Sequence, residues 1–219
     1  MADDPVRVSR HPAFRMVLLC LVLGLSYFKW LPFPWRQPAV AVIAVSLVLM
    51  SGESLADVGF RRARFWATIG WALVAVVLTC GVITPFVEPF LNRMTGTPAD
   101  YSGYGELTGN LPAALQLIAF AWLSAAIGEE IIFRGFLLHE TGAVFGTGRT
   151  AAAGSVILGS VLFGLSHNAQ GLVGMILTGL AGLLTGVIFL ASNRNIWSII
   201  LAHGLIDVWG VLTLYYGWY

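Results

Sequence analysis

About seven apolar segments follow one another along the chain, and most have the length of a membrane-spanning helix. Their approximate bounds are 14–31, 38–51, 65–87, 111–138, 151–166, 172–191 and 196–216. A helix needs about 20 predominantly apolar residues to cross a bilayer. Only 11% of the residues are charged, against about 25% in a soluble domain. The sequence therefore predicts an all-α, polytopic transmembrane bundle of about seven spans, with a second segment too short to be sure of crossing.

Basic residues indicate the orientation of these spans. With the N-terminus inside, one side of the membrane holds most of the Lys and Arg residues, as expected for the cytoplasmic side. We therefore expect a cell-membrane protein with a cytoplasmic N-terminus, and an uncleaved signal-anchor rather than a cleaved signal peptide. The inner residues are Arg7, Arg10, Arg15, Arg61, Arg62, Arg64, Arg149 and Arg194, and the outer ones are Lys29, Arg36 and Arg93.

The connections divide the chain without separating it into independent domains. We expect N-terminal spans and an external loop over 1–110 and a catalytic core over 111–217, forming one integral membrane domain. The loop over 88–110 is either a solvated connector or a lid over a substrate site. Ser54 could cap a short interfacial helix. Gly182 and Gly186 have the spacing that lets membrane helices pack closely.

The sequence Gly128-Glu129-Glu130-Ile131-Ile132-Phe133-Arg134 places three ionisable groups inside an apolar segment. A charged residue at the centre of a bilayer costs roughly 2.5–3.5 kcal/mol on insertion scales. Glu130 and Arg134 are four residues apart on a helix, so they can form an ion pair. Glu129 is then the carboxylate without a partner on its own helix. It is a candidate general base, while a static charge cluster that joins helices is the alternative.

Two further apolar segments carry polar groups. Phe163-Gly164-Leu165-Ser166-His167 ends one segment, and His203-Gly204-Leu205-Ile206-Asp207 lies within the last. Glu and His residues from separate helices can activate a water, stabilise an oxyanion or hold a metal. Counted at about 1.5 Å per residue, Glu129 and His203 fall in the middle or inner half of the membrane, but His167 falls near the outer end. The face on which such a site opens therefore stays undecided.

The three motifs together resemble the CPBP family of intramembrane proteases, which includes the Rce1-type CAAX prenyl endopeptidases and the bacterial Abi proteins. The motifs are Glu129-Glu130-x-x-x-Arg134, Phe163-x-x-x-His167 and His203-x-x-x-Asp207, and Asp57-Val58-Gly59-Phe60 is similar to a further short motif of the family. The resemblance covers about 111–209. It implies a helical-bundle endopeptidase that hydrolyses a peptide bond near or within the membrane.

The resemblance also implies roles for single residues. Glu129 would activate water with assistance from His167, Glu130 and Arg134 would hold their helix in place, and His203 with residue 207 would stabilise the oxyanion. Catalytic members more often have Asn at the last position. An ionised Asp cannot donate a hydrogen bond.

Asp207 therefore fits better as the partner that orients His203, or as a metal ligand. A scheme without a cofactor is favoured. The alternative is a divalent metal such as zinc held by Glu129, His167, His203 and Asp207, because no His-Glu-x-x-His motif decides the question.

Other functions and partners follow from the same residues. The net charge of +1 and the lack of a basic patch exclude a nucleic-acid partner. The expected partners are the lipid bilayer and a membrane-associated protein or peptide substrate, whose identity and cleavage signal stay open, as does the oligomeric state. A non-enzymatic scaffold or immunity protein with a structural polar cluster is the alternative, and a proton-coupled transporter comes third. His139 and Glu140 are read as interfacial and non-catalytic.

Overall fold

The computed structural model describes residues 11–218, and within that range the fold is entirely helical, as predicted. Arg7 and Arg10, which support the predicted orientation, lie outside the described residues. The α-helices are α2 (Pro12–Tyr27), α3 (Arg36–Met50), α4 (Phe65–Leu78), α5 (Glu88–Thr95), α6 (Leu111–Ala121), α7 (Leu138–Phe145), α8 (Arg149–Ser166), α9 (Gly171–Ala191) and α10 (Ile196–Tyr215). Wider π-helical turns are η1 (Thr79–Val87), η3 (Trp122–Glu129) and η4 (Ile131–Leu137), and short 3₁₀ turns are η2 (Ser102–Tyr104) and η5 (Asn168–Gln170).

Several of these elements join into longer rods. The helix from Phe65 to Thr95 is continuous through η1, and that from Leu111 to Phe145 is continuous through η3 and η4. These two rods and the helices Arg149–Ser166, Asn168–Ala191 and Ile196–Tyr215 are long and apolar enough to cross a membrane. The helices α2 and α3 are apolar but shorter. The chain is thus an integral membrane protein, as its composition indicates.

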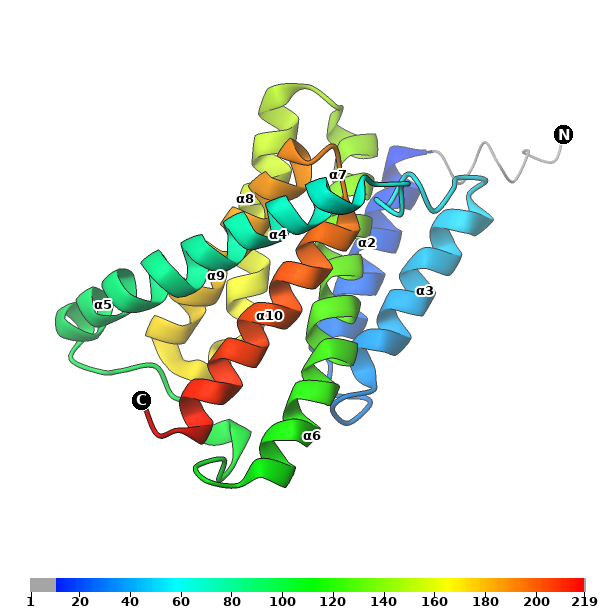
Figure 1. The fold of residues 1–219 in the computed structure, drawn as a ribbon. Coiled ribbons are helices and arrows are strands. Elements are labelled where there is room, and N and C mark those ends of the chain that lie inside the picture. Colours follow the sequence, from blue (N-terminus) through cyan, green and yellow to red (C-terminus); the bar gives the residue numbers. More distant parts are fainter. Residues whose placement is uncertain (1–10, 219) are drawn as a thin grey trace, which may run out of the picture.

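The rods run up and down, so that their connections gather at two ends of the bundle (Figure 1). The connections over 51–64, 146–148 and 192–195 lie at one end, and the segments over 28–35, 96–110 and 167–170 lie toward the other. The first group carries most of the basic loop residues, namely Arg61, Arg62, Arg64 and Arg194, and Arg149 begins α8 beside it. This distribution agrees with the counting that predicts the orientation, which itself stays a prediction.

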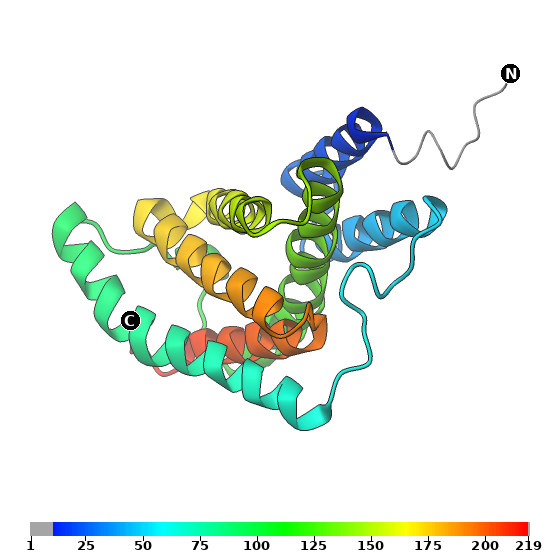
Figure 2. The same ribbon diagram turned by 90° about the horizontal axis from the view of Figure 1, so that it is seen from above.

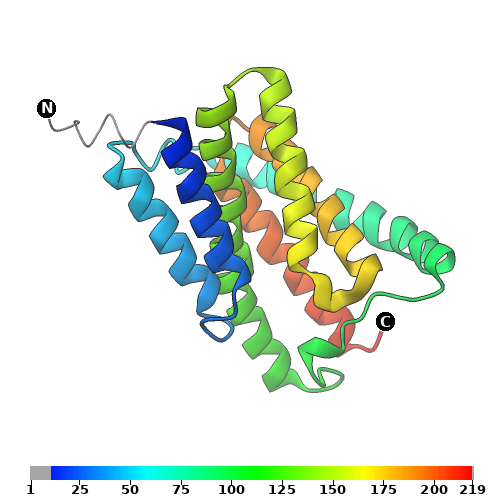
Figure 3. The ribbon, with the colours of Figure 1, turned by 180° about the vertical axis from the view of Figure 1, so that it is seen from behind.

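The rod from Phe65 to Thr95 lies across the outside of α9 and α10 when the bundle is seen from above (Figure 2). On the opposite side, α2 and α3 cover the helix from Leu111 to Phe145 (Figure 3). That helix is therefore central, and its middle part holds the largest fully buried side chains of the core. Ile132, Phe133, Phe136 and Leu137 belong to this helix. The same core contains the fully buried side chains of Phe189 from α9 and Ile199 from α10.

The helices α8 and α9 approach closely through glycine. A Cβ atom at Gly164 would lie 2.5 Å from the backbone oxygen of Met175, and one at Gly186 would lie 2.9 Å from the Val156 side chain. A Cβ atom at Gly182 would meet the Phe163 ring at 3.1 Å. The packing role predicted for Gly182 and Gly186 is confirmed, because both face α8.

Three local predictions are wrong. Residues 88–95, expected in a loop, continue the preceding helix, which ends where Gly96 adopts a φ of 69°. Residues 54–57 form a turn instead of an interfacial helix, because the Asp57 carboxylate accepts hydrogen bonds from the backbone and hydroxyl of Ser54.

The third correction concerns His139 and Glu140, which lie within the last part of the central helix and not just past its span. The helix continues past them to Phe145, and Glu140 is only 2% exposed. Arg15 of α2 pairs with Glu140 at 3.3 Å and with Glu53 at 2.5 Å, and His139 Nε2 lies 2.7 Å from Glu53. Both residues stay inside because they are paired, which satisfies buried charge.

Candidate active site

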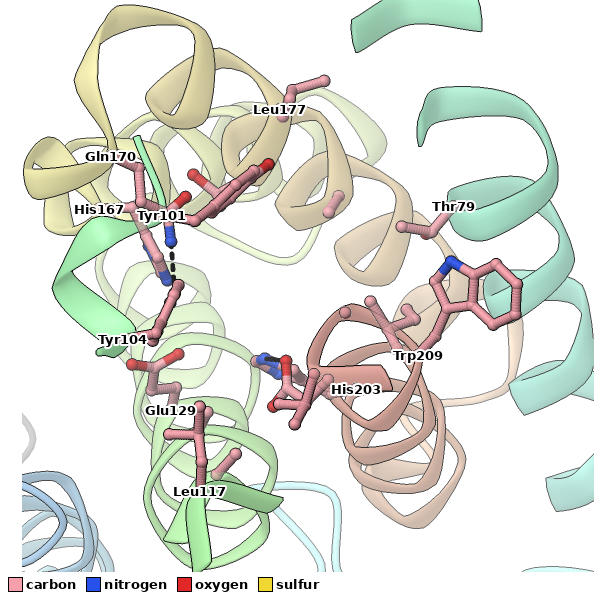
Figure 4. A pocket seen from close by; sticks show the side chains of 18 of the residues that line it. Thr79, Tyr101, Tyr104, Leu117, Glu129, His167, Gln170, Leu177, His203 and Trp209 are labelled. Carbon is pink, nitrogen blue, oxygen red and sulfur yellow. Dashed lines mark hydrogen bonds and ion pairs between the residues drawn. The ribbon is translucent and has the colours of Figure 1, made fainter. Parts of the chain in front are cut away.

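Four of the predicted site residues line one cavity of about 320 Å³ inside the bundle. Glu129 enters it from the central helix, His167 from the C-terminal end of α8, and His203 and Asp207 from α10. Figure 4 shows Glu129, His167 and His203 directed into this space from different helices. The remaining two predicted residues, Glu130 and Arg134, are buried beside the cavity and do not line it.

The bundle also explains how His167 reaches the depth of Glu129. The central helix and α8 are antiparallel and meet at the turn over 146–148. Glu129 and His167 are each about 24–27 Å from that turn, at 1.5 Å per residue. The membrane depths counted from the sequence differ for Glu129 and His167 because the predicted segment ends at 138, whereas the helix continues to Phe145.

Glu130 joins two of the motifs. Its Oε1 atom accepts a hydrogen bond of 2.7 Å from Nδ1 of His203. The same oxygen lies 3.2 Å from Nη1 of Arg134, which is the ion pair predicted from their spacing. Glu130 is completely buried, so this shared carboxylate connects the central helix to α10 without contact with solvent.

Arg134 connects the same carboxylate to α8 and α9. Its Nη2 atom donates hydrogen bonds to Thr185 Oγ1 at 2.7 Å and to the Gly182 carbonyl at 3.3 Å. The guanidinium also lies 4.5 Å from the centre of the Phe163 ring, a favourable cation–π distance. Glu130 and Arg134 thus hold together the helices that present His167 and His203.

The ring of His203 is oriented by Glu130 rather than by Asp207, which was the expected partner. Asp207 Oδ1 lies 3.7 Å from His203 Nε2, which is beyond hydrogen-bond distance but within reach of an ionic attraction. The other oxygen of Asp207 is buried without a hydrogen-bond partner. Asp207 therefore presents an unsatisfied acceptor to the cavity.

The geometry of His167 fixes which ring nitrogen can act on a substrate. Its Nδ1 atom lies 2.9 Å from the carbonyl oxygen of Phe163. A carbonyl only accepts hydrogen bonds, so Nδ1 carries the proton and donates it. In the neutral ring the Nε2 atom then keeps its lone pair, which is the form needed to accept a proton or a hydrogen bond.

Glu129 has the property expected of a base. Its Oε2 atom is buried and makes no hydrogen bond with the residues that the structure describes. No cation of its own helix neutralises it, because Arg134 is held by Glu130, Thr185 and Gly182. A buried carboxylate oxygen without a partner is costly and calls for a bound water or a substrate.

The proposed metal ligands do not form a compact set. Among residues 11–218, the group with three ligand atoms within 4.8 Å of one another is Glu53, His139 and Glu140, which is not in the cavity. Arg15 already pairs with both carboxylates of that group. Glu129, His167, His203 and Asp207 have the right donor chemistry for a divalent cation, but their atoms are not gathered as a preformed site requires.

Sequence reasoning missed three residues of the loop and turn beside the cavity. Tyr101, Tyr104 and Gln170 line it, and Gln170 Nε2 donates a 2.6 Å hydrogen bond to the Tyr104 hydroxyl. The backbone of Asp100 also donates to the Gln170 carbonyl at 3.0 Å. The segment over 96–110 therefore folds against the cavity, the arrangement of the lid that was one of its two expected roles. Gln170 follows His167 by one turn, which is the only sequence signal for it.

Comparison with known proteins gives one match. A family model described as "Type II CAAX prenyl endopeptidase Rce1-like" matches residues 111–209, a little under half of the chain. The match confirms the resemblance carried by the three motifs, and it supports a protease. No curated protein and no solved structure matches the chain.

Proposed function

We propose, from the premise that residues 111–209 belong to the type II CAAX prenyl endopeptidase Rce1-like family, that this protein hydrolyses a peptide bond of a membrane-associated protein or peptide. The observation that carries the proposal is the unpaired, buried Oε2 atom of Glu129 in the cavity that His167 also lines. A carboxylate and a neutral imidazole around one small space can hold and polarise a water molecule.

The reaction begins with this water. Glu129 takes one proton from it, and Nε2 of His167 accepts a hydrogen bond from the other O–H group. The water oxygen attacks the scissile carbonyl carbon, and the π electrons of that bond move to the oxygen as a negative charge. When the intermediate collapses, the C–N bond breaks. Glu129 returns the proton to the leaving amine, so a carboxylic acid and an amine form and the base is regenerated; the acid then loses its remaining proton to the amine, which gives carboxylate and ammonium products.

His203 stabilises the charge on that oxygen. A carboxylate lies beside each of its ring nitrogens, Glu130 at Nδ1 and Asp207 at Nε2, which is the environment of an imidazolium. An imidazolium donates from both nitrogens. Nδ1 is used by Glu130, and Nε2 is left to face the cavity. Glu130 and Arg134 act on this step only by holding the helices in place.

We further propose that the reaction needs no metal. Each step above uses a proton acceptor or donor that the chain itself supplies. Peptide cleavage that survives prolonged treatment with chelators and is not raised by added zinc would support this scheme. Cleavage that chelators abolish and zinc restores would contradict it.

The substrate class follows from the family's name, which specifies a prenylated CAAX sequence. The test uses the purified protein in liposomes with a fluorescent peptide that ends in a farnesylated CAAX sequence. Wild-type protein should cleave the peptide within its CAAX sequence, and Glu129→Gln, which keeps the size but removes the base, should lower kcat by at least about 100-fold. Glu106→Gln, at an exposed position outside the cavity, is the control. Full activity of Glu129→Gln would exclude the glutamate-base mechanism.

We also propose that the protein lies in the cell membrane with the basic end of the bundle in the cytoplasm. The segment over 96–110 and the Tyr104 side of the cavity would then face outward. Single cysteines at Ser54 and Ser102, in variants with Cys20 and Cys80 replaced by Ala, test this arrangement in intact cells. An impermeant maleimide should label the second and spare the first, and the reverse pattern would invert the orientation.

A further inference from the structure

We propose that Tyr104 donates the second hydrogen bond to the oxyanion, and that Gln170 positions it for this purpose. The proposal rests on the proposed peptide hydrolysis and assigns it one more catalytic residue. Tyr104 belongs to the turn η2, between two spans, and lies outside all three sequence motifs.

The need for a donor comes from Asp207. Oxyanion stabilisation commonly uses two or more donors directed at the developing charge. Asp207 lines the cavity, with its Oδ1 atom 3.7 Å from Nε2 of His203. Its carboxylate offers acceptors only when ionised. His203 can supply one donor from Nε2, so the cavity has one donor fewer than expected.

The Tyr104 hydroxyl has the required hydrogen-bond arrangement. Gln170 Nε2 donates to its oxygen at 2.6 Å, which occupies an acceptor site and leaves the hydroxyl proton unused by Gln170. Tyr104 lines the cavity together with Glu129, His167, His203 and Asp207. Figure 4 shows it between Gln170 and the Glu129 carboxylate, on the side of the pocket where His167 lies. The hydroxyl proton is therefore available to a substrate in the cavity.

The environment keeps this hydroxyl protonated. Tyr104 is 41% exposed as a residue, but partial desolvation of its hydroxyl, reinforced by the negative charges of Asp207 and Glu129, raises the pKa of Tyr104 to about 12. A phenol with that pKa remains a donor throughout the neutral range. The same carboxylates repel a second negative charge at this place, so a donor that stays neutral is suited to it.

Gln170 is held where it can orient the tyrosine. Its backbone carbonyl accepts a hydrogen bond from Asp100, and its side chain packs over Gly174, where an added Cβ would lie 2.2 Å from the Gln170 Cβ. These contacts join the segment over 96–110 to the turn that follows His167. Gln170 thus acts through Tyr104 and is a positioning residue.

The experiment measures kcat and KM for the farnesylated CAAX peptide in liposomes. Tyr104→Phe should lower kcat on the order of 100-fold, the loss typical of one oxyanion donor, with KM changed by less than about threefold. Tyr216→Phe, which removes the hydroxyl of an exposed tyrosine that does not line the cavity, should match the wild type. A Tyr104→Phe protein with wild-type kcat, or with its loss confined to KM, would overturn the proposal and leave Tyr104 as a lid residue.

Two further variants separate this chemistry from a structural role. Asp207→Asn places an amide donor in the cavity. The double variant Tyr104→Phe with Asp207→Asn should therefore have a kcat at least about tenfold higher than Tyr104→Phe alone. Gln170→Glu should lower kcat more than Gln170→Ala, because a carboxylate would accept the tyrosine proton and withhold it from the substrate. The opposite order for Gln170 would also count against the proposal. Activity in Glu129→Gln would instead contradict the proposed function.

Discussion

His203 Nδ1 and Glu130 Oε1 form a 2.7 Å hydrogen bond between α10 and the central helix, deep inside the bundle. The two residues belong to different sequence motifs, 73 positions apart. Because the same oxygen contacts Arg134, a single carboxylate fixes both an imidazole of the cavity and the guanidinium beneath it. The doubled acidic residues of the first motif therefore have different tasks: Glu130 is structural, and Glu129 faces the cavity.

Replacing Glu130 alone should destabilise the protein. Glu130→Met leaves Arg134, which is 3% exposed, without its anion. Removing one partner of a buried pair typically costs about 3–5 kcal/mol. Thermal unfolding in detergent, followed by tryptophan fluorescence, should show a clear fall in Tm.

The double variant Glu130→Met with Arg134→Met is the matched control. It removes both charges, so it should recover most of the lost stability, as replacement of buried pairs by apolar residues often does. Cleavage of the probe peptide should stay low in both variants, because His203 has lost its orienting partner. Equal Tm values for the wild type and Glu130→Met would contradict a structural role for Glu130.

A methyl group at Gly164 should separate α8 from α9. Its Cβ would lie 2.5 Å from the Met175 carbonyl oxygen, and backbone atoms cannot move aside as a flexible side chain can. Gly164→Ala should therefore lower stability by about 1–3 kcal/mol, the usual cost of overpacking. Since Phe163 and His167 flank this contact, activity should fall with it.

Gly154→Ala is the comparison within the same helix. No atom lies within 4 Å of the Cβ position at Gly154. This substitution should leave stability unchanged or raise it by up to about 1 kcal/mol, because alanine favours a helix over glycine. Similar Tm shifts for the two alanine variants would show that the close contact between α8 and α9 is unimportant.

Stability should fall at acid pH because of Glu53, which lies in the loop between α3 and α4. Burial alone would raise the pKa of Glu53, but the hydrogen bonds and charges of Arg15 and His139 outweigh it, so the pKa is lowered. Its stabilising contribution is complete above the unfolded-state pKa of about 4.3. That contribution is lost as the pH falls through the lower pKa of the folded state.

The measurement is the Tm difference between wild type and Glu53→Gln from pH 7 to pH 3.5. The difference should be constant near neutral pH and should shrink below about pH 4.3, where the wild type loses its advantage. Carboxylates far from Glu53 titrate alike in both proteins and cancel in the difference. A gap that widens on acidification would show that the pKa of Glu53 is raised rather than lowered.

Much of this architecture can be predicted from local sequence. The helix bounds lie within a few residues of the apolar segments, except that two helices continue further, to Thr95 and to Phe145. The segment over 88–95 was missed because Glu88 and Arg93 resemble loop residues. Pro89 at the start of α5 fits a helix equally well, since its missing N–H group has no role there.

The candidate site, too, can be predicted from the sequence only in part. The three motifs could be found because each repeats a spacing of one helical turn, and Glu130 with Arg134 follows from that spacing alone. The contact of Gln170 with Tyr104 joins residues 66 positions apart. This contact depends on how a loop folds back over the bundle, and the spacing of apolar and polar residues along the chain does not predict such a fold. The orienting of His203 by Glu130 is likewise a contact between helices.

The π-helical turns that flank Glu130 also bear on how this chain can vary. A π turn usually marks one residue inserted into an α-helix, and here η3 ends at Glu129 and η4 begins at Ile131, on either side of Glu130. Each insertion rotates the residues that follow it about the helix axis, relative to the residues that precede it. Deleting one residue within either turn would restore a tighter helix and rotate one half of the site relative to the other, so we expect the central helix to tolerate substitutions there far better than changes in length.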